Sequence, residues 1–390
     1  MNIQAIRDDT PAVKNLLHFN NAGSALPPKQ VLEVIINHLT LESQVGGYEA
    51  AAINEKEIEN FYQAIAKLIN ASTDEIAYAE NATRAWDMAF YAIPFKKGDR
   101  ILTGISEYAS NYIAYLQVAQ QKGVKIEVIP NDSYGQLDVK VLENRIDEKV
   151  KLISITHVPT NGGLINPAEA IGQIARKANI LYLLDACQSV GQMPIDVEKI
   201  GCDILSVTGR KFLRGPRGTG FLYVNKKIVE QLTPPFLDLL SAEWIDKNTY
   251  KIREDAKRFE NWERYVAGQI GLGTAVDYLL NLGINNVWAR IQSLADSLRS
   301  KLKSLNKVIL HDLGRHKCGI VSFTIKDADP LHIKEQLAKR NINIGISKRP
   351  YTLLDMQSRN LEDILRASIH YYNTEEEIEK FITHLLKLSK

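Results

Sequence analysis

Cysteine is scarce in this sequence: Cys187, Cys202 and Cys318 are the only three among 390 residues. Their spacing matches neither a disulfide framework nor a set of metal ligands, so we expect no disulfide, no metal site and a reducing, cytoplasmic location. Long apolar runs are missing too, and the N-terminal segment lacks the apolar core of a signal peptide. We therefore expect no membrane-spanning segment and no membrane partner.

An excess of charge of one sign is missing as well. The chain has 48 Lys and Arg residues against 46 Asp and Glu residues, and its net charge of +2 is spread along its length. This balance gives no reason to expect nucleic acid as a partner. No G-x-G-x-x-G motif follows an early strand, which disfavours a nicotinamide-binding enzyme.

The segment from Leu181 to Tyr223 carries the strongest positive signal. Three short apolar runs within it, bounded by turn residues, predict neighbouring strands of a buried sheet. Asp185 ends the first run, and Lys211 follows the second. Because ligands of α/β proteins bind at strand ends, the acid and the lysine are predicted to meet in one site. Single Asp and Lys residues are mostly solvated surface groups, so only their combination argues for chemistry.

A strand-to-helix turn is predicted at Asn81-Ala82-Thr83, between the apolar run Ile76–Ala79 and a helix from Arg84. Such a turn directs backbone N–H groups and the positive end of a helix dipole at one point, which suits a phosphate. Helix capping by Asn81 explains the same residues without any ligand.

Further periodic patterns predict elements on both sides of these segments. Gly46 and Gly47 mark a loop, and the weakly periodic segment 236–255 predicts a long loop over the site. We expect the segment 236–258 to govern substrate choice. Strands are expected at 100–103, 125–129, 151–156, near 308, at 320–325 and at 342–346, and helices at 31–41, 53–69, 168–178, 268–282, 287–305 and from 374.

Taken together, Asp185-Ala186-Cys187-Gln188 and Thr208-Gly209-Arg210-Lys211 resemble the class V aminotransferase and cysteine desulfurase family of pyridoxal phosphate (PLP) enzymes. The lysine follows the aspartate by 211 − 185 = 26 positions, as is typical of that family. The likeness extends from Asn20-Asn21-Ala22-Gly23 to Arg366-Ala367-Ser368.

The resemblance implies an α/β protein of PLP fold type I, the aspartate-aminotransferase-like fold. This fold has a large domain with a mostly parallel seven-stranded sheet and a small α+β C-terminal domain. The implied boundaries are an N-terminal arm at 1–19, a large PLP-binding domain at 20–282 and a small domain at 283–390, to which the N-terminal segment contributes.

The same resemblance assigns catalytic roles to two residues. Lys211 is expected to form a Schiff base with PLP and then to take the Cα proton, with its pKa lowered by burial and by Arg210. Asp185 is expected to face the pyridine nitrogen. The other implied cofactor contacts are Ala82, Thr83, Thr208 and Arg210 at the phosphate, Tyr108 on the ring face, Gln188 with Thr160 or Asn161 at the phenolic oxygen, and Asn261 and Trp262 from a partner subunit.

The substrate is expected to bind at Asn21 and Arg366. Arg366 lies in the apolar, β-like run Leu365–Ile369, where an unpaired guanidinium is costly. The resemblance implies the α-carboxylate of an amino acid as its partner, and a salt bridge to a buried acid is the alternative. It also implies a homodimer with the site at the interface.

The reaction is narrowed by two departures from the desulfurase pattern. In cysteine desulfurases a mobile cysteine ahead of the carboxylate-binding arginine takes the sulfur, but segment 342–366 contains no cysteine. A histidine that stacks on the cofactor in those enzymes is replaced by Tyr108, which removes a titratable imidazole. The segments Val45–Ala51 and Arg258–Glu263 are instead similar to C–S lyases of the hercynylcysteine sulfoxide type.

We therefore expect a β-eliminating C–S lyase that acts on an S-substituted cysteine or its sulfoxide and yields pyruvate and ammonia. The alternative reactions are those of a class V aminotransferase or epimerase, or of a cysteine desulfurase. A catalytically silent member that serves as a partner subunit is the alternative without chemistry, and the intact pair of Asp185 and Lys211 argues against it.

Overall fold

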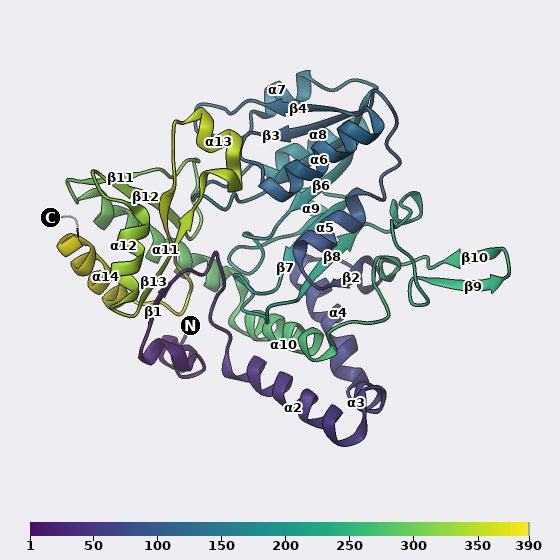
Figure 1. Ribbon diagram of the computed structural model, residues 1–390, viewed down its shortest axis with the longest axis horizontal. Coiled ribbons are helices and arrows are strands. Elements are labelled where there is room, and N and C mark those ends of the chain that lie inside the picture. Colours follow the sequence, from purple (N-terminus) through teal and green to yellow (C-terminus); the bar gives the residue numbers. More distant parts are fainter. Residues whose placement is uncertain (389–390) are drawn as a thin grey trace.

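A seven-stranded sheet forms the centre of the computed structural model, which describes residues 1–388 (Figure 1). The strand order is β2-β8-β7-β6-β5-β3-β4. Strand β8 runs antiparallel to its neighbours β2 and β7, and the remaining pairs are parallel, which confirms the predicted mostly parallel sheet. The strands are β2 (Ile76–Ala79), β3 (Arg100–Gly104), β4 (Lys125–Ile129), β5 (Val150–Thr156), β6 (Leu181–Asp185), β7 (Ile204–Thr208) and β8 (Gly220–Val224).

Both faces of this sheet are covered by helices, which is why its central strands read as continuous apolar runs. Successive side chains of β6 enter different cores: Tyr182 and Leu184 join one cluster, and Leu183 joins the other. The first cluster includes residues of α4 (Glu55–Ile69) and α8 (Ala168–Ala178), and the second includes residues of α5 (Ala82–Phe90) and α6 (Ala109–Lys122). Short helices α7 (Val139–Asn144) and α9 (Val197–Ile200) lie in the connections.

A second sheet of five strands has the order β1-β13-β14-β12-β11. Strand β1 comes from the N-terminal segment, after helix α1 (Ile3–Asp8), and pairs in parallel with β13. The domain limits given above stay predictions. The strands are β1 (Leu17–Phe19), β11 (Val308–Leu310), β12 (Ile320–Ile325), β13 (Ile342–Ser347) and β14 (Ile364–Ser368), and the nearby helices are α11 (Ile284–Lys303), α12 (Pro330–Ala338), α13 (Leu353–Ser358) and α14 (Glu375–Leu388).

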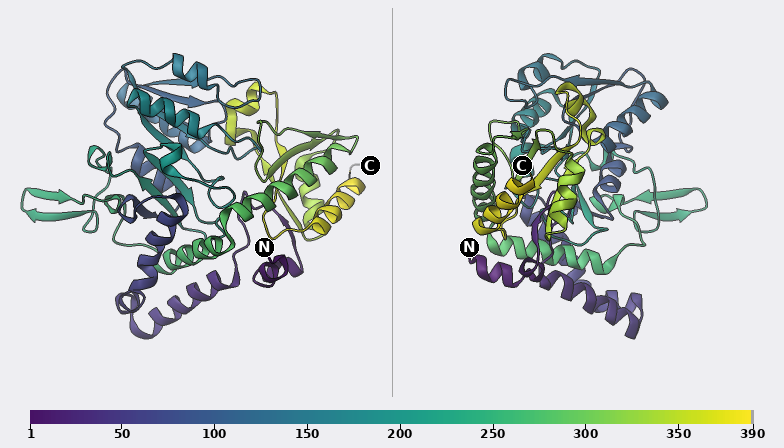
Figure 2. Two further views of the ribbon diagram at one scale, coloured as in Figure 1. Left: turned by 180° about the vertical axis from the view of Figure 1, so that it is seen from behind. Right: turned by 60° about the vertical axis from the view of Figure 1, so that its left-hand side comes forward.

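Helix α10 (Val266–Leu282) connects the two sheets through α11 (Figure 2). It packs against α4 and against α2 (Lys29–Val45), which lies along the surface. Gly283 separates α10 from α11 with φ 78° and ψ 115°, a conformation that favours glycine. The chain therefore turns at one residue between the large and the small sheet.

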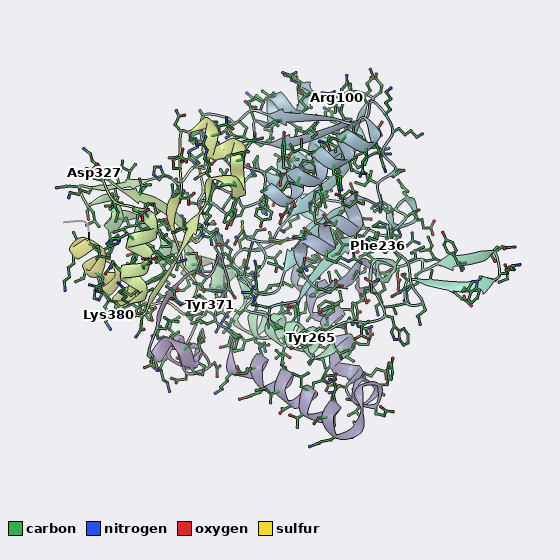
Figure 3. All side chains as sticks on the ribbon, in the orientation of Figure 1. Arg100, Phe236, Tyr265, Asp327, Tyr371 and Lys380 are labelled. Carbon is green, nitrogen blue, oxygen red and sulfur yellow. The ribbon has the colours of Figure 1, made fainter. Side chains whose placement is uncertain are left out.

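Two predicted loops contain regular structure. Helix α3 (Gly47–Ile53) begins directly at Gly47, because only Gly46 has the positive φ of 101° that interrupts the helical path. The segment predicted as a loop over the site forms a hairpin of β9 (Ala242–Asp246) and β10 (Thr249–Ile252) that extends away from the large sheet (Figures 1 and 2). Figure 3 places Phe236 on the same side of the molecule as this hairpin.

The prediction of a loop without regular structure was wrong here for a physical reason. Its turn is closed locally by Asp246, which accepts hydrogen bonds from the Asn248 N–H at 2.8 Å and the Thr249 hydroxyl at 2.6 Å. Its strands have no buried face, since Trp244 is 79% exposed and Tyr250 is 60% exposed, so the sequence shows no alternation of apolar residues that would predict them.

Within residues 1–388, no helix combines the length and the apolar character needed to cross a bilayer.

Candidate active site

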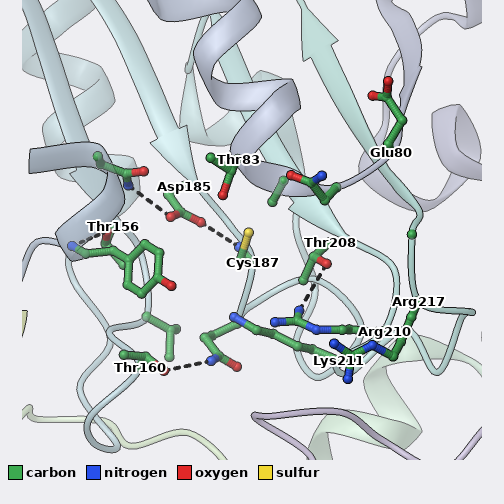
Figure 4. Close-up of a pocket in the computed structure, with 17 residues that line it drawn as sticks. Glu80, Thr83, Thr156, Thr160, Asp185, Cys187, Thr208, Arg210, Lys211 and Arg217 are labelled. Carbon is green, nitrogen blue, oxygen red and sulfur yellow. Dashed lines mark hydrogen bonds between the residues drawn. The ribbon is translucent and has the colours of Figure 1, made fainter. Parts of the chain in front are cut away.

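A cavity of about 330 Å³ lies where the parallel strands of the large sheet end (Figure 4). Its wall brings together residues from the ends of β2, β5, β6 and β7, which confirms that the sheet edge gathers polar side chains. The lining residues are Glu80, Asn81, Ala82, Thr83, Tyr108, Asn111, Thr156, Val158, Thr160, Asp185, Cys187, Gln188, Thr208, Arg210, Lys211, Arg217 and Gly218.

Lys211 extends into this cavity from the turn after β7. Gly209 makes the turn possible, because a Cβ at that position would lie 2.3 Å from the Thr219 hydroxyl oxygen. Burial lowers the pKa of Lys211 from 10.5 to about 8; among neighbouring charges, Cys187 raises it and Arg210 lowers it. A substantial fraction of the amine is therefore unprotonated, and nucleophilic, slightly above neutral pH.

The lowered pKa makes Lys211 costly for the apoprotein. Below pH 8 the folded chain must hold a buried ammonium, and between pH 8 and 10.5 the unfolded chain binds the additional proton, so stability rises with pH in that window. At neutral pH we expect the Lys211→Met apoprotein to be more stable than the wild type by about 3 kcal/mol. Denaturant unfolding from pH 7 to 10 measures this difference. Parallel curves for the two proteins contradict the expectation.

Asp185 is held in one orientation at the end of β6. One carboxylate oxygen, Oδ1, accepts a hydrogen bond from the Cys187 N–H at 3.0 Å, and Oδ2 accepts one from Asn111 Nδ2 at 3.0 Å. The side chain is buried, with 6% of the residue exposed. A fixed, buried carboxylate that faces a cavity is a suitable partner for a protonated ring nitrogen.

The turn at Asn81 forms a seat for an anion. The Asn81 side chain caps α5 by accepting a hydrogen bond from the Arg84 N–H at 2.9 Å, and the first turn of the helix points its N–H groups toward the cavity. Arg210 reaches the same place from the other side and donates to the Thr208 hydroxyl at 3.2 Å. Gly220 permits this closeness, because a Cβ there would lie 2.5 Å from the Val207 carbonyl oxygen and 3.4 Å from the Ala82 nitrogen.

The opposite wall presents a polar atom that lacks a partner. Gln188 Nε2 donates to the Ala22 carbonyl at 3.0 Å and to the Thr160 hydroxyl at 3.3 Å, whereas Gln188 Oε1 is buried without a hydrogen bond to any described residue. Buried polar atoms are nearly always satisfied, so a ligand group is expected there. Tyr108 also lines the cavity.

Arg366, on β14, lies directly beside the cavity. Its NH1 group donates to the carbonyl and the hydroxyl of Thr160, both at 2.7 Å, and Nε is buried without a partner. Within residues 1–388 no carboxylate lies at ion-pair distance from it. The salt-bridge alternative is therefore not realised among these residues. Burial without an opposite charge lowers the pKa of Arg366 from 12.5 to about 10, so an anionic ligand fits beside this guanidinium.

Besides Arg366, four predicted site residues lie outside the cavity wall, and the roles of all five stay predictions. Asn21 is occupied by the fold: its Nδ2 donates to the Ser368 carbonyl at 2.7 Å, and its Oδ1 accepts from Tyr372. Asn161 Nδ2 donates to Asp355 Oδ2 at 2.7 Å. Asn261 Oδ1 accepts a hydrogen bond from Arg84 at 3.2 Å, and Trp262 is 44% exposed, so their predicted contacts with a partner's cofactor stay predictions.

Several residues in or behind the cavity wall were not predicted from the sequence, among them Glu107 and Asn111. A signal was present, because Glu107 directly precedes the capping residue of α6 and Asn111 lies in the first turn of that helix, so the two side chains are close along the chain. Asn111 Nδ2 donates to Glu107 Oε1 at 2.9 Å. Thr156, Glu80 and Arg217 also line the cavity without having been singled out.

Three features meet at this edge of the sheet: a buried lysine of lowered pKa, a fixed carboxylate and an anion-binding site at the N-terminus of α5. Together they define the class of PLP enzymes of fold type I. The aminotransferase class-V family model matches residues 17–381. The chain belongs to the class V aminotransferase family, and it is therefore a PLP-dependent enzyme.

Several named proteins are similar to this chain over their whole length. A probable cysteine desulfurase of Pyrococcus abyssi is 30% identical over 99% of this chain and 97% of its own, and one of Borreliella burgdorferi is 30% identical over 100% and 96%. The apo structure of a cysteine desulfurase from Thermococcus onnurineus NA1 superposes with a TM-score of 0.92 at 27% identity, covering 99% of this chain and 98% of the other. The cystine C–S lyase C-DES has a TM-score of 0.87 at 23% identity, covering 97% and 99%, and that likeness concerns the fold alone.

The residues present fit PLP. The orphaned Gln188 oxygen and the anion seat provide partners for polar groups of a flat, phosphorylated ring, and the cavity volume suits one. The names of these relatives agree with the cysteine desulfurase alternative better than with the expected C–S lyase.

Proposed function

We propose that this enzyme cleaves the Cβ–S bond of a cysteine-type amino acid, and that it does so by β-elimination. The relatives' names support cysteine or a derivative as the substrate class. The observation that carries elimination is the absence of a usable sulfur acceptor. Cys187 is the one cysteine among the described residues of the cavity wall, and burial together with the charge of Asp185 raises the pKa of its thiol well above 9.0.

In this proposal each wall residue has one task. Lys211 holds the cofactor aldehyde, Asp185 faces the ring nitrogen, and Thr83, Thr208 and Arg210 hold the phosphate. When bound, PLP supplies the sink for the electron pair released at the substrate Cα. Arg366 binds the α-carboxylate, since its Nε is buried without a partner and its NH2 has only a 3.4 Å contact with Asn20 Oδ1. Gly345 keeps these atoms uncovered, because a Cβ there would lie 3.1 Å from both.

The bond changes balance without an added oxidant or reductant. Lys211 Nζ takes the proton from Cα, the Cα–Cβ double bond forms, and the sulfur leaves with the electron pair of the Cβ–S bond and takes up a proton. The released 2-aminoacrylate hydrolyses to pyruvate and ammonia. Tyr108 provides no imidazole to protonate the sulfur, so substituted cysteines with a good leaving group are favoured over cysteine itself.

Cysteine desulfuration is the second candidate, and the names of the relatives favour it. In that reaction the sulfur passes to an acceptor thiol and the amino-acid product is alanine. Cys202 and Cys318 are buried, and burial raises the pKa of each thiol, Cys318 to about 12. Sulfur transfer within the chain would therefore have to use Cys187.

A product assay decides between the two reactions. PLP-loaded enzyme is supplied with cysteine, cystine and hercynylcysteine sulfoxide, and pyruvate and alanine are measured separately. We expect pyruvate as the product, with the rate of the Cys187→Ala variant within about twofold of the wild type because the thiol is not a reactant. Alanine without pyruvate, or loss of turnover in Cys187→Ala, overturns elimination and supports the desulfurase.

A further inference from the structure

A buried polar network adjoins Asp185: Asn111 and Thr156 line the cavity beside it, and Glu107 lies behind them. Asn111 Nδ2 donates to two carboxylates at once, to Asp185 Oδ2 at 3.0 Å and to Glu107 Oε1 at 2.9 Å. Asn111 and Glu107 are each 4% exposed. The two N–H bonds of one amide therefore connect a carboxylate on the cavity wall with a second carboxylate in the interior.

Glu107 is surrounded by hydrogen-bond donors from neighbouring strand ends. Its oxygens accept from the Thr103 hydroxyl at 3.0 Å, from the Thr156 N–H at 3.2 Å and from the Tyr108 N–H at 2.9 Å, in addition to Asn111 and the Thr156 hydroxyl. Thr156 is the strand partner of Asp185 in β5 and β6. The network thus spans β3, β5 and β6 at the edge where the cavity opens.

This arrangement places a second negative charge behind Asp185. Burial, the largest influence, and the charge of Asp185 raise the pKa of Glu107 above its usual value, and the hydrogen bonds from Thr156 and Asn111 limit that rise. All groups that contact its oxygens are donors, which is the environment of an ionised carboxylate. Two carboxylates that share one amide attract a proton or a cation more strongly than one does.

We propose that Glu107 and Asn111 are positioning residues that act through Asp185 on the ring nitrogen of the cofactor. Asn111 fixes the orientation of the Asp185 carboxylate, and Glu107 adds negative charge that favours the protonated nitrogen. This inference rests on the proposed role of Asp185 and not on the cleavage of a C–S bond, so it stands or falls independently of the reaction.

A cofactor analogue with carbon in place of the ring nitrogen isolates this effect. For Asn111→Ala we expect the dissociation constant of PLP to rise about tenfold, since a hydrogen bond to a charged group is lost. The dissociation constant of the analogue should change less than about twofold, because the analogue has no nitrogen for Asp185 to face. Both constants are measured by equilibrium dialysis with purified apoprotein.

Asn166→Ala is the matched control. Asn166 is also a buried asparagine, and it donates to the Thr156 carbonyl at 2.8 Å without touching Asp185 or Glu107. Loss of the Asn166 amide should raise the dissociation constants of PLP and of the analogue by the same factor. If Asn111→Ala raises both dissociation constants equally, or raises neither, the proposal is overturned. A purely structural residue does not distinguish the pyridine ring of PLP from the carbon ring of the analogue.

Glu107→Gln tests the charge itself and serves if Asn111→Ala does not fold. Glu107→Gln should weaken the binding of PLP more than that of the analogue, and it should lower the pH at which the visible band of bound PLP titrates. Glu107→Asp keeps the charge, so it should restore the wild-type ratio of the two dissociation constants. A PLP-to-analogue ratio unchanged from the wild type in Glu107→Gln overturns the proposal.

Discussion

Replacement of Lys211 by alanine is expected to lower pyruvate formation by about 10⁴-fold, the upper range for loss of a general base, because one amine both holds the cofactor and takes the Cα proton. The wild-type amine is poised for this work, since burial lowers its pKa from 10.5 to about 8. The measurement is pyruvate release from an S-substituted cysteine under saturating PLP, with the visible band of the bound cofactor recorded in parallel.

Lys199→Ala is the control for this experiment. The Lys199 side chain is 75% exposed and lies outside the cavity wall, so its loss should leave the rate unchanged. If Lys211→Ala binds PLP and still forms pyruvate at more than a tenth of the wild-type rate, the amine is not the base and the assignment of this cavity as the catalytic site is wrong.

Arg366→Leu is expected to weaken binding of the amino-acid substrate by a hundredfold or more. A buried guanidinium that forms charge-assisted hydrogen bonds with a carboxylate contributes about 2–5 kcal/mol when its removal leaves the other charge unpaired. In the structure this guanidinium has a free Nε and no carboxylate at ion-pair distance among the described residues, so a substrate carboxylate fits the vacant position. Titration of the cofactor band with substrate measures the dissociation constant.

An S-substituted cysteamine, which lacks the carboxylate, separates recognition from general damage. It should bind to the wild type and to Arg366→Leu within about threefold, because the interaction that is removed does not involve it. Arg359→Leu is the matched arginine control: it removes a 3.1 Å ion pair with Asp355 outside the cavity wall and should affect both compounds alike. Equal weakening of both compounds in Arg366→Leu shows that this residue does not bind the carboxylate.

The sequence predicts the large sheet well because its strands are buried on both faces and therefore appear as short, continuous apolar runs. The predicted limits of β4 and α8 coincide with those observed. The position of Lys211 opposite Asp185 follows from the same logic, since two adjacent parallel strands must end at one edge. Nine of the predicted site residues line the cavity for this reason: Ala82, Thr83, Tyr108, Thr160, Asp185, Gln188, Thr208, Arg210 and Lys211.

What the sequence does not reveal is which polar side chains face one another across the fold. Asn111 and Asp185 are separated by 74 residues, and their hydrogen bond exists only because α6 starts beside the end of β6. Asn21 reads as a ligand-binding amide in a turn, yet the fold occupies its side chain with Ser368 and Tyr372, more than 340 residues away. Patterns of burial are local, whereas hydrogen-bond partners of single side chains are decided by tertiary packing.

The pairing of β1 with β13 sets an order of events during biosynthesis. Leu17 is among the first residues made, but its strand partner Ile342 follows 325 residues later. At ribosomal speeds this is a delay of roughly half a minute, during which the apolar strand Leu17–Phe19 has no edge to join. Arg366, the proposed carboxylate-binding residue, is made later still, so the large sheet and the cavity at its edge can form first, and the proposed amino-acid recognition is acquired only as the last strands are made.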